Sequence, residues 1–489
     1  MDRRMWVWLR AARMIRFAVA IILSILAGRS FNANAQTETN LYSFGNFPND
    51  GQEPWGGLVQ GSDGDFYGTT YGGGTYSNGS VFRISPRGSY TNLYSFGSSP
   101  NDGIKPQAGL VQGSDGNFYG TTWLGGTSTN CVSLGCGTVF RISPSGSYSN
   151  LHSFVGHPSD GANPLASLVQ GIDGDLYGTT AIGGTYQRGT VFRISPSGSY
   201  TNLYAFGPPP DGANPSAGLA QGSDGNFYGT TQVGGANGSG TVFRISLSGS
   251  ETNLHSFGSS PGDGATPKAG LVQGSDGSFY GTTAYGGLSN LGTTFRIGRS
   301  GSYTNLHPFV GLPNDGYLSF AGLVQGSDGN FYGTTVGGGQ YGQGNVYRMT
   351  PGGTYTNLYS LGSSSNDGIQ PLAGLVQGSD GGFYGTTLVG GTSTSCGTGC
   401  GTVFKLTVPL NPPANQVSAF RQAGTDIIFD VPSVAGETYQ LQFGSSMNPT
   451  NWVNVPGVSV TNSIGALLTL TNFGGAVGPQ GFYRFDITP

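Results

Sequence analysis

The aspartates of this sequence have the clearest potential for chemistry, because most of them recur in two regular sets of seven. Every member of both sets is followed by glycine. The first set lies in copies of the segment GSDGNFYGTT and comprises Asp63, Asp115, Asp173, Asp224, Asp276, Asp328 and Asp380. The second set follows segments similar to TNLYSFG and comprises Asp50, Asp102, Asp160, Asp211, Asp263, Asp315 and Asp367. Such carboxylates could bind calcium, catalyse hydrolysis or build turns.

We interpret the first set as turn residues. An Asp-Gly pair tolerates the positive φ that two-residue β-hairpins require. Calcium is the alternative, but it takes roughly six to eight oxygen ligands, often from several carboxylates, and most of these turns offer one. The additional carboxylates Asp65 and Asp175 make the first and third copies the better calcium candidates. No other cofactor is predicted.

The histidines give little support for catalysis. His152, His255 and His307 occupy a strand position that is tyrosine in other repeats, which leaves only His157 in a loop. A nucleophilic triad therefore has no evident candidate, and the glycines form no phosphate-binding or dinucleotide-binding motif. A glycosidase needs two carboxyl groups about 5–10 Å apart, which repeated aspartates could supply. We predict no catalytic residue and keep a carbohydrate-active hydrolase or lyase as the alternative.

The cysteines mark two unusual loops. Cys131 and Cys136 lie in one, Cys396 and Cys400 in the other, and these loops are longer than their counterparts in the other repeats. Because the insertion and the cysteine pair occur together, we predict a local disulfide in each loop, as expected for an exported protein. A zinc site would need both pairs together, yet they belong to the second and seventh repeats.

The spacing of the first-set aspartates predicts the architecture. Successive members are 52, 58, 51, 52, 52 and 52 residues apart. A period near 50 with several short strands per unit is typical of propeller blades. Each unit reads as four strands, similar to GLVQ, FYGTT, TVFRI and SYTNLYSF, but the last unit lacks its own fourth strand. We predict an all-β, seven-bladed propeller over residues 36–407, in which an N-terminal strand at 38–44 pairs with 402–406 and closes the ring.

The repeat GLVQGSDGNFYGTT…GGTVFRIS…GSYTNLYSF also resembles the GloVer tandem repeats of exported bacterial proteins, named from Gloeobacter and Verrucomicrobia. The resemblance covers about residues 37–407. It implies the repeat unit and export, and it implies no activity.

Both ends of the chain differ from the repeats. Residues 1–35 combine arginines, the apolar run FAVAIILSILAG and an A-x-A site, which predicts a cleaved signal peptide, with an uncleaved membrane anchor as the alternative. Residues 408–413 form a proline-rich linker. Residues 414–489 alternate apolar and polar residues, which predicts a small C-terminal β-sandwich, and the segment resembles Ig-like or fibronectin-like modules.

Export and charge limit the partners. Residues 1–35 carry six arginines and one aspartate, so their removal takes the net charge from −4 to −9. Nucleic acid is therefore not an expected partner. We expect an extracellular, cell-surface or periplasmic monomer without a transmembrane segment after signal cleavage.

The loops after the second strand of each blade vary most between repeats. Since binding residues are often carried on loops of a rigid scaffold, we expect an unknown glycan or protein ligand on the face formed by the 2–3 and 4–1 loops. The candidates are the second-set aspartates and the loop aromatics Tyr71, Tyr76, Trp123, Tyr186, Tyr285 and Tyr341. The alternatives are solvated loops without a ligand, or a surface-structural role. The predicted function is an exported, non-catalytic binding or surface-structural propeller.

Overall fold

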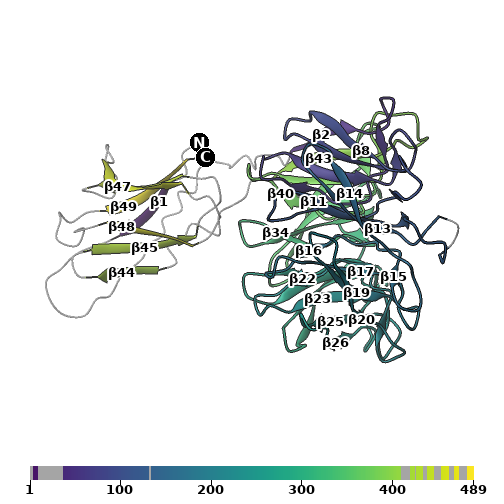
Figure 1. The fold of residues 1–489 in the computed structure, drawn as a ribbon. Helices are drawn as coiled ribbons and strands as arrows, with labels where there is room; N and C mark the ends of the chain where they lie inside the picture. The colour runs from purple at the N-terminus through teal and green to yellow at the C-terminus, as the bar shows by residue number, and fades with distance from the viewer. Residues whose placement is uncertain are drawn as a thin grey trace.

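The computed structural model describes residues 4–8, 37–131 and 134–408, together with six strands between residues 419 and 488. Residues 37–407 contain seven four-stranded antiparallel sheets arranged as a ring (Figure 1). The predicted all-β seven-bladed propeller is therefore confirmed. Within the described parts of the chain, no helix is long and apolar enough to cross a membrane.

The blades are built alike, from the centre of the ring outward. The first strands are β4 (Val59–Gln60), β10 (Val111–Gln112), β16 (Val169–Gln170), β22 (Ala220–Gln221), β28 (Val272–Gln273), β34 (Val324–Gln325) and β40 (Val376–Gln377). The second strands are β5 (Phe66–Thr70), β11 (Phe118–Thr122), β17 (Leu176–Thr180), β23 (Phe227–Thr231), β29 (Phe279–Thr283), β35 (Phe331–Thr335) and β41 (Phe383–Thr387).

The outer half of each blade holds the third and fourth strands. The third strands are β7 (Ser80–Ile84), β13 (Thr138–Ile142), β19 (Thr190–Ile194), β25 (Thr241–Ile245), β31 (Thr293–Ile297), β37 (Asn345–Met349) and β43 (Thr402–Thr407). The fourth strands are β8 (Tyr90–Ser95), β14 (Tyr148–Ser153), β20 (Tyr200–Ala205), β26 (Glu251–Ser256), β32 (Tyr303–Pro308), β38 (Tyr355–Ser360) and β2 (Thr37–Ser43).

The N-terminal strand closes the ring as predicted. β2 pairs antiparallel with β43, with Asn40 opposite Phe404. Closure also continues a circle of seven hydrogen bonds, in which a backbone N–H of each 1–2 turn donates to a glutamine of the next blade. At the junction, Ser379 N donates to Gln60 Oε1 at 2.9 Å. Such closure leaves no open sheet face at the ends of the repeat.

The core lies between adjacent blades, because the second strands are buried on both faces. Tyr67 stacks on Phe118 of the next blade with ring centroids 3.9 Å apart. Phe66 stacks in the same way on Tyr384 at the closing junction, at 4.0 Å. The glycine of each FYGTT strand is required by close packing: a Cβ on Gly120 would lie 2.5 Å from Cζ of Phe140.

A short additional ladder, which the sequence did not reveal, joins the loops on one side of every blade. The 4–1 loop pairs with the following 2–3 loop through β3 (Gly51–Gln52) and β6 (Gly72–Gly73), β9 (Gly103–Ile104) and β12 (Leu124–Gly125), β15 (Gly161–Ala162) and β18 (Ile182–Gly183), β21 (Gly212–Ala213) and β24 (Val233–Gly234), β27 (Gly264–Ala265) and β30 (Tyr285–Gly286), β33 (Gly316–Tyr317) and β36 (Gly337–Gly338), and β39 (Gly368–Ile369) and β42 (Val389–Gly390). Both loop types therefore share one face, which we call the loop face. The 1–2 and 3–4 turns form the opposite turn face.

The remaining strands pair into two further sheets. One contains β44 (Ala419–Ala423), β45 (Asp426–Pro432) and β48 (Leu467–Asn472). The other contains β46 (Thr438–Gly444), β47 (Val453–Thr461), β49 (Phe482–Thr488) and β1 (Arg4–Trp8). The packing of the predicted C-terminal sandwich and most of the predicted linker and signal peptide lie outside the described residues. These domain assignments therefore stay predictions.

Candidate functional site

The first-set aspartates lie in the 1–2 turns of the turn face. Asp115 Oδ2 accepts hydrogen bonds from the Tyr119 hydroxyl and from Asn117 Nδ2, both at 2.7 Å. Burial acts to raise the pKa of Asp115, but hydrogen bonds from Asn117 and Tyr119 outweigh it and hold the pKa below its ordinary value. Gly116 follows with φ +80°, as the predicted tight turn requires.

The same tyrosine–aspartate hydrogen bond recurs in all seven blades, at 2.6–3.0 Å. The carboxylates of the first set are thus committed to the turn and to the adjacent strand. Asp65 and Asp175, the predicted extra calcium ligands, lie 3.6 Å from Arg83 and Arg193 of their own blades. Among the residues with described side chains, no group of three or more His, Cys, Asp or Glu could hold a metal ion.

The second-set aspartates hold the 4–1 loops from inside. Asp50 accepts hydrogen bonds from Gly45 N at 2.8 Å, Gly51 N at 2.8 Å and the Tyr42 hydroxyl at 3.0 Å. Asp50 is 6% exposed, and five of its six counterparts are buried to a similar degree. These carboxylates therefore accept hydrogen bonds from the backbone of their own loops. Their contact with a ligand stays a prediction.

The six predicted loop aromatics are not one cluster. Tyr71 and Trp123 come from neighbouring blades, and their rings lie 6.3 Å apart at an angle of 28°. Tyr76, Tyr186 and Tyr341 project from the loops of three separate blades, each about half exposed. Tyr285 belongs to a fourth blade and stands in the short ladder strand β30.

Tyr71 and Trp123 are part of a larger group, which we call the blade 1–2 cluster and which contains Trp55, Tyr71, Lys105 and Trp123. Trp55 and Tyr71 have ring centroids 5.5 Å apart. Lys105 Nζ lies 4.7 Å from the centroid of Tyr71 and donates to the Ser77 carbonyl at 3.0 Å. Burial lowers the pKa of Lys105, and the negative charge of the nearby Glu53 offsets part of this by raising the pKa. The cluster thus combines aromatic faces with a cation.

The backbone that carries this cluster is the same in every blade. Lys105 has φ +59°, and its counterparts, including Thr266 and Leu318, also have φ between 53° and 59°. Such φ values are unfavourable for residues with a Cβ, so the loop geometry is imposed by its surroundings. Trp123 N donates to the Lys105 carbonyl at 3.2 Å. The fold therefore fixes the backbone and leaves the side chains free to differ.

The cluster breaks the sevenfold repeat. Residues equivalent to Trp55 are Gln107, Leu165, Ser216, Lys268, Phe320 and Leu372, and residues equivalent to Tyr71 and Trp123 are Ala181, Gln232, Ala284, Val336 and Leu388. Sequence reasoning missed Trp55 and Lys105. Alignment of the 4–1 loops would have found Trp55, because PWGG stands where most repeats have P-x-A. The indole Nε1 of Trp55 is buried and makes no hydrogen bond within the described part of the chain.

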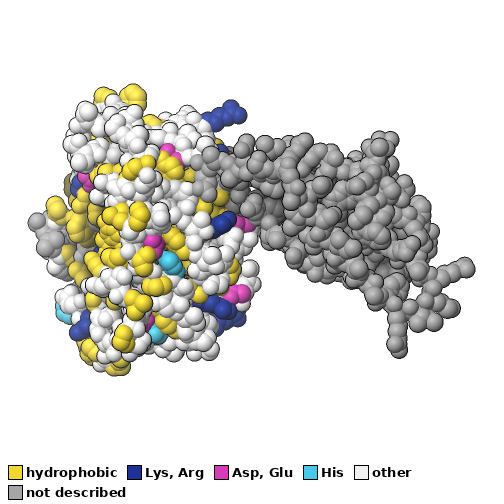
Figure 2. Space-filling view, turned by 180° about the vertical axis from the view of Figure 1, so that it is seen from behind, with side chains coloured by type: hydrophobic (Ala, Val, Ile, Leu, Met, Phe, Trp, Pro, Cys, Tyr) yellow, Lys and Arg dark blue, Asp and Glu magenta, His cyan; other side chains and the backbone are white. Residues whose placement is uncertain are grey.

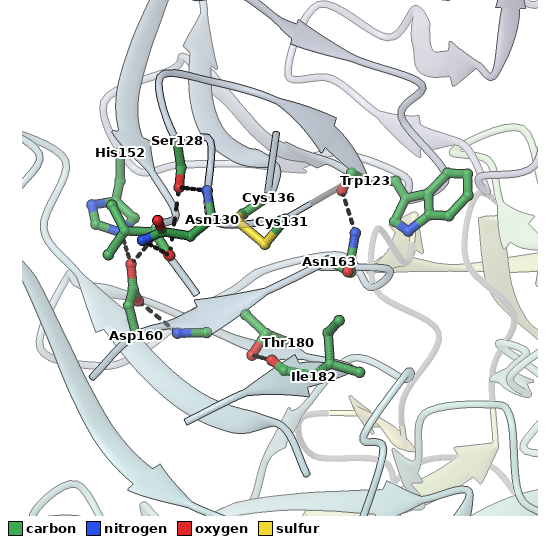
Figure 3. Close-up of a disulfide and its surroundings, with 12 residues drawn as sticks. Trp123, Ser128, Asn130, Cys131, Cys136, His152, Asp160, Asn163, Thr180 and Ile182 are labelled. Carbon is green, nitrogen blue, oxygen red and sulfur yellow. Dashed lines mark hydrogen bonds and ion pairs between the residues drawn. A yellow bond between two sulfur atoms is a disulfide. The ribbon is translucent and has the colours of Figure 1, made fainter. Parts of the chain in front are cut away.

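The two predicted disulfides are present, Cys131–Cys136 and Cys396–Cys400. In Figure 3 the first disulfide lies between the loop residues Ser128 and Asn130 and the ladder below, while Trp123 points away from it. Asn163 Nδ2 donates to the Trp123 carbonyl at 3.1 Å, which ties the backbone of the cluster to the next blade (Figure 3). Each disulfide closes a short segment within one of the two longest 2–3 loops.

The ring of four-stranded blades and the variable loop face define a β-propeller of repeated units. A family model described as the Gloeobacter/Verrucomicrobia repeat matches residues 27–169 and 132–326, so this chain belongs to that family. No curated protein matches the sequence.

Several solved structures are similar in fold at low identity. A fungal alcohol oxidase of the AA5 family in complex with copper is 14% identical, with 93% of this chain and 96% of that chain covered and a TM-score of 0.49. The extracellular domain of a putative hybrid two-component system from B. thetaiotaomicron is 13% identical, with 89% and 48% covered and a TM-score of 0.45. A putative gluconolactonase is 12% identical, with 77% and 93% covered and a TM-score of 0.39. These similarities carry no information on activity.

Proposed function

We propose that this protein is an exported, non-catalytic binding propeller, and that its ligand docks on the loop face at the blade 1–2 cluster. The observation that carries the proposal is the local break in the repeat. Two neighbouring blades carry Trp55, Tyr71 and Trp123, on an otherwise unchanged backbone, at positions where the other blades have no tryptophan or tyrosine. Aromatic faces beside a few polar groups suit sugars and peptides. We expect a glycan to be the ligand.

Export is supported by the two disulfides, because such bonds persist in oxidising compartments outside the cytosol. It also agrees with the signal peptide predicted for residues 1–35. The second-set aspartates contribute indirectly, since they hold the 4–1 loops in the conformation that presents Trp55 and Lys105.

A hydrolase would need an accessible pair of carboxyl groups. Glu38 and Asp367 line a hollow of about 480 Å³ at the outer edge of the ring. However, Glu38 Oε1 and Asp367 Oδ1 are buried, and Asp367 is only 6% exposed. Glu38 also occupies a position that is tyrosine in five other blades. We therefore favour a structural role for this pair, and the non-catalytic function.

The proposal is tested by a glycan-array assay of the wild-type protein and the variants Y71A and W123A, with Y186A as the matched control. Loss of an aromatic platform is expected to weaken binding at least about tenfold, as for other central interface aromatics. Y186A changes an exposed tyrosine of another blade and should bind like the wild type. Binding that is unchanged in W123A, or a wild-type array without any signal, would contradict the proposal.

A further inference from the structure

Each boundary between two blades carries a repeated set of three side chains, which we call a seam triad. One residue comes from the fourth strand of the first blade, the second from the start of the fourth strand of the next blade, and the third is the second-set aspartate. At the boundary of blades 1 and 2, Tyr94 stacks on Tyr148 with centroids 4.1 Å apart. The Tyr94 hydroxyl donates to Asp102 Oδ2 at 2.7 Å.

Histidine replaces the first tyrosine at three boundaries without changing the arrangement. His152 stacks on Tyr200 at 3.9 Å, and its Nε2 lies 3.1 Å from Asp160 Oδ2 (Figure 3 shows the histidine and the aspartate). In order along the ring, the triads are Tyr42–Tyr90–Asp50, Tyr94–Tyr148–Asp102, His152–Tyr200–Asp160, Tyr204–Glu251–Asp211, His255–Tyr303–Asp263, His307–Tyr355–Asp315 and Tyr359–Glu38–Asp367.

Two triads have glutamate where the other five have tyrosine. A tyrosine hydroxyl in this position can donate a hydrogen bond to the aspartate, but a carboxyl group can do so only while it carries a proton. Within the described parts of the chain, Glu38 Oε1 and Asp367 Oδ1 are both buried without a hydrogen-bond partner. Two ionised carboxylates in this seam would repel each other, whereas one shared proton would satisfy both oxygens.

Among the residues that the structure describes, no cation faces either glutamate. Glu38 faces Asp367 and Tyr359, and Lys405 of the paired strand β43 stands opposite Thr39 and binds Asp380 at 2.7 Å. Burial, with a smaller contribution from Asp367, raises the pKa of Glu38 to about 7.

Glu251 occupies the equivalent position of its seam, but both oxygens of Asp211 already accept hydrogen bonds, Oδ1 from Gly212 N and Oδ2 from Gly207 N and the Tyr204 hydroxyl. Glu251 faces Asp211 and Tyr204, and Arg244 of the paired strand stands opposite Thr252. Burial, with a smaller contribution from Asp211, raises the pKa of Glu251 to about 7. Both seams therefore favour the protonated carboxyl group under mildly acidic conditions.

We propose that Glu38 and Glu251 remain protonated in the folded ring and donate to Asp367 and Asp211, so that two of the seven seams weaken as the pH rises through neutrality. Because Glu38 lies on β2, the strand that completes the last blade, one of these seams lies at the closing junction of the ring. The stabilisation is complete below the unfolded-state pKa of about 4.5 and is lost as the pH rises to about 7. This inference is independent of the proposed ligand site.

The experiment compares the thermal unfolding midpoint, Tm, between pH 5 and pH 8 for the wild type and for the double variants E38Q/E251Q and E38Y/E251Y. Glutamine and tyrosine both donate without losing a proton in this range. We expect the wild-type Tm to fall by several degrees and both variants to lose at least half of that fall. The measured quantity is the difference between each variant and the wild type, so that the pH dependence of the rest of the protein cancels.

The control is E53Q, which removes one carboxylate from the loop face and should retain the wild-type pH dependence. A second readout is the number of protons released on unfolding at pH 6. Because each glutamate is protonated in the folded ring and ionised in the unfolded chain at this pH, the wild type should release about two more protons than either double variant. If E38Q/E251Q fails to fold, E38Y/E251Y decides, because tyrosine is the residue of the other five seams. An unchanged pH dependence and unchanged proton release in the variant that folds would overturn the proposal.

Discussion

The two faces of the ring are built from the same repeats but use their side chains differently. On the turn face the same residues recur, and their polar groups bind one another: Tyr119 with Asp115, and Lys405 with Asp380 at 2.7 Å. On the loop face the residue types change from blade to blade. Figure 2 shows basic and acidic side chains near one another toward the right of the ring, while hydrophobic side chains spread over its left and centre.

This difference distinguishes residues that recur for structural reasons from residues that depart from the repeat. A polar residue that recurs seven times with the same internal partner is explained by the architecture, however suggestive its type. A residue that departs from the repeat on an unchanged backbone needs another explanation, and the blade 1–2 cluster is such a departure.

The largest effect is expected from deletion of residues 37–43, which removes β2. Blade 7 would lose its outer strand and the ring its closure, so cooperative unfolding should disappear. Circular dichroism melts and size-exclusion chromatography measure this. The control Thr39→Ser changes one exposed β2 residue and should melt like the wild type. A sharp, unshifted melt of the deletion variant would show that closure by β2 is not required.

A smaller effect is expected from C131A/C136A. Removing a disulfide that spans so short a segment lowers the unfolding free energy by about 2 kcal/mol through chain entropy. Proteolysis of the loop should accelerate, and the Tm of the ring should fall by a few degrees. C396A/C400A is the matched variant in blade 7. Thiol titration of the wild type without reductant should detect no free cysteine, and detection of four would disprove both bridges.

On the turn face, Asp115→Ala should cost about 1–2 kcal/mol of unfolding free energy, because Tyr119 and Asn117 lose their acceptor. Asp65→Ala is the matched control: it removes a partly exposed partner of Arg83 and should cost less than about 1 kcal/mol. Urea denaturation measures both. Equal losses would mean that the hydrogen bonds to Asp115 add nothing beyond surface charge.

The smallest expected effect is that of calcium. The first-set carboxylates are already occupied by hydrogen bonds, so we expect the same Tm in EDTA and in millimolar calcium. A calcium-dependent increase in Tm, abolished by Asp65→Ala or Asp175→Ala, would instead establish the alternative interpretation of the turns.

The architecture could be predicted because it depends on periodic features. The 52-residue spacing, the missing last fourth strand and the Asp-Gly turns each specify a local geometry that neighbouring repeats reinforce. The histidines were also correctly interpreted as replacements for tyrosine, because they keep the same contact with aspartate. The cysteine pairs were predictable since each accompanied a loop insertion.

The candidate site could be derived from the sequence only in part. Tyr71 and Trp123 were identified from loop variation, but their proximity depends on the order of blades around the ring. Trp55 and Lys105 were missed because they lie in the 4–1 loops, whereas the candidate aromatics were taken from the variable 2–3 loops. The seam triads could not be predicted either, since they join residues of two blades that no local pattern connects.

The central claim is that the turn face stabilises the ring and the loop face binds the ligand. The most direct test is to measure Tm and glycan-array binding together for D115A and W123A. We predict that D115A lowers Tm and binds like the wild type, whereas W123A keeps its Tm and loses binding. If both variants lose the same property, or if the wild type binds no glycan, the division between the two faces is wrong.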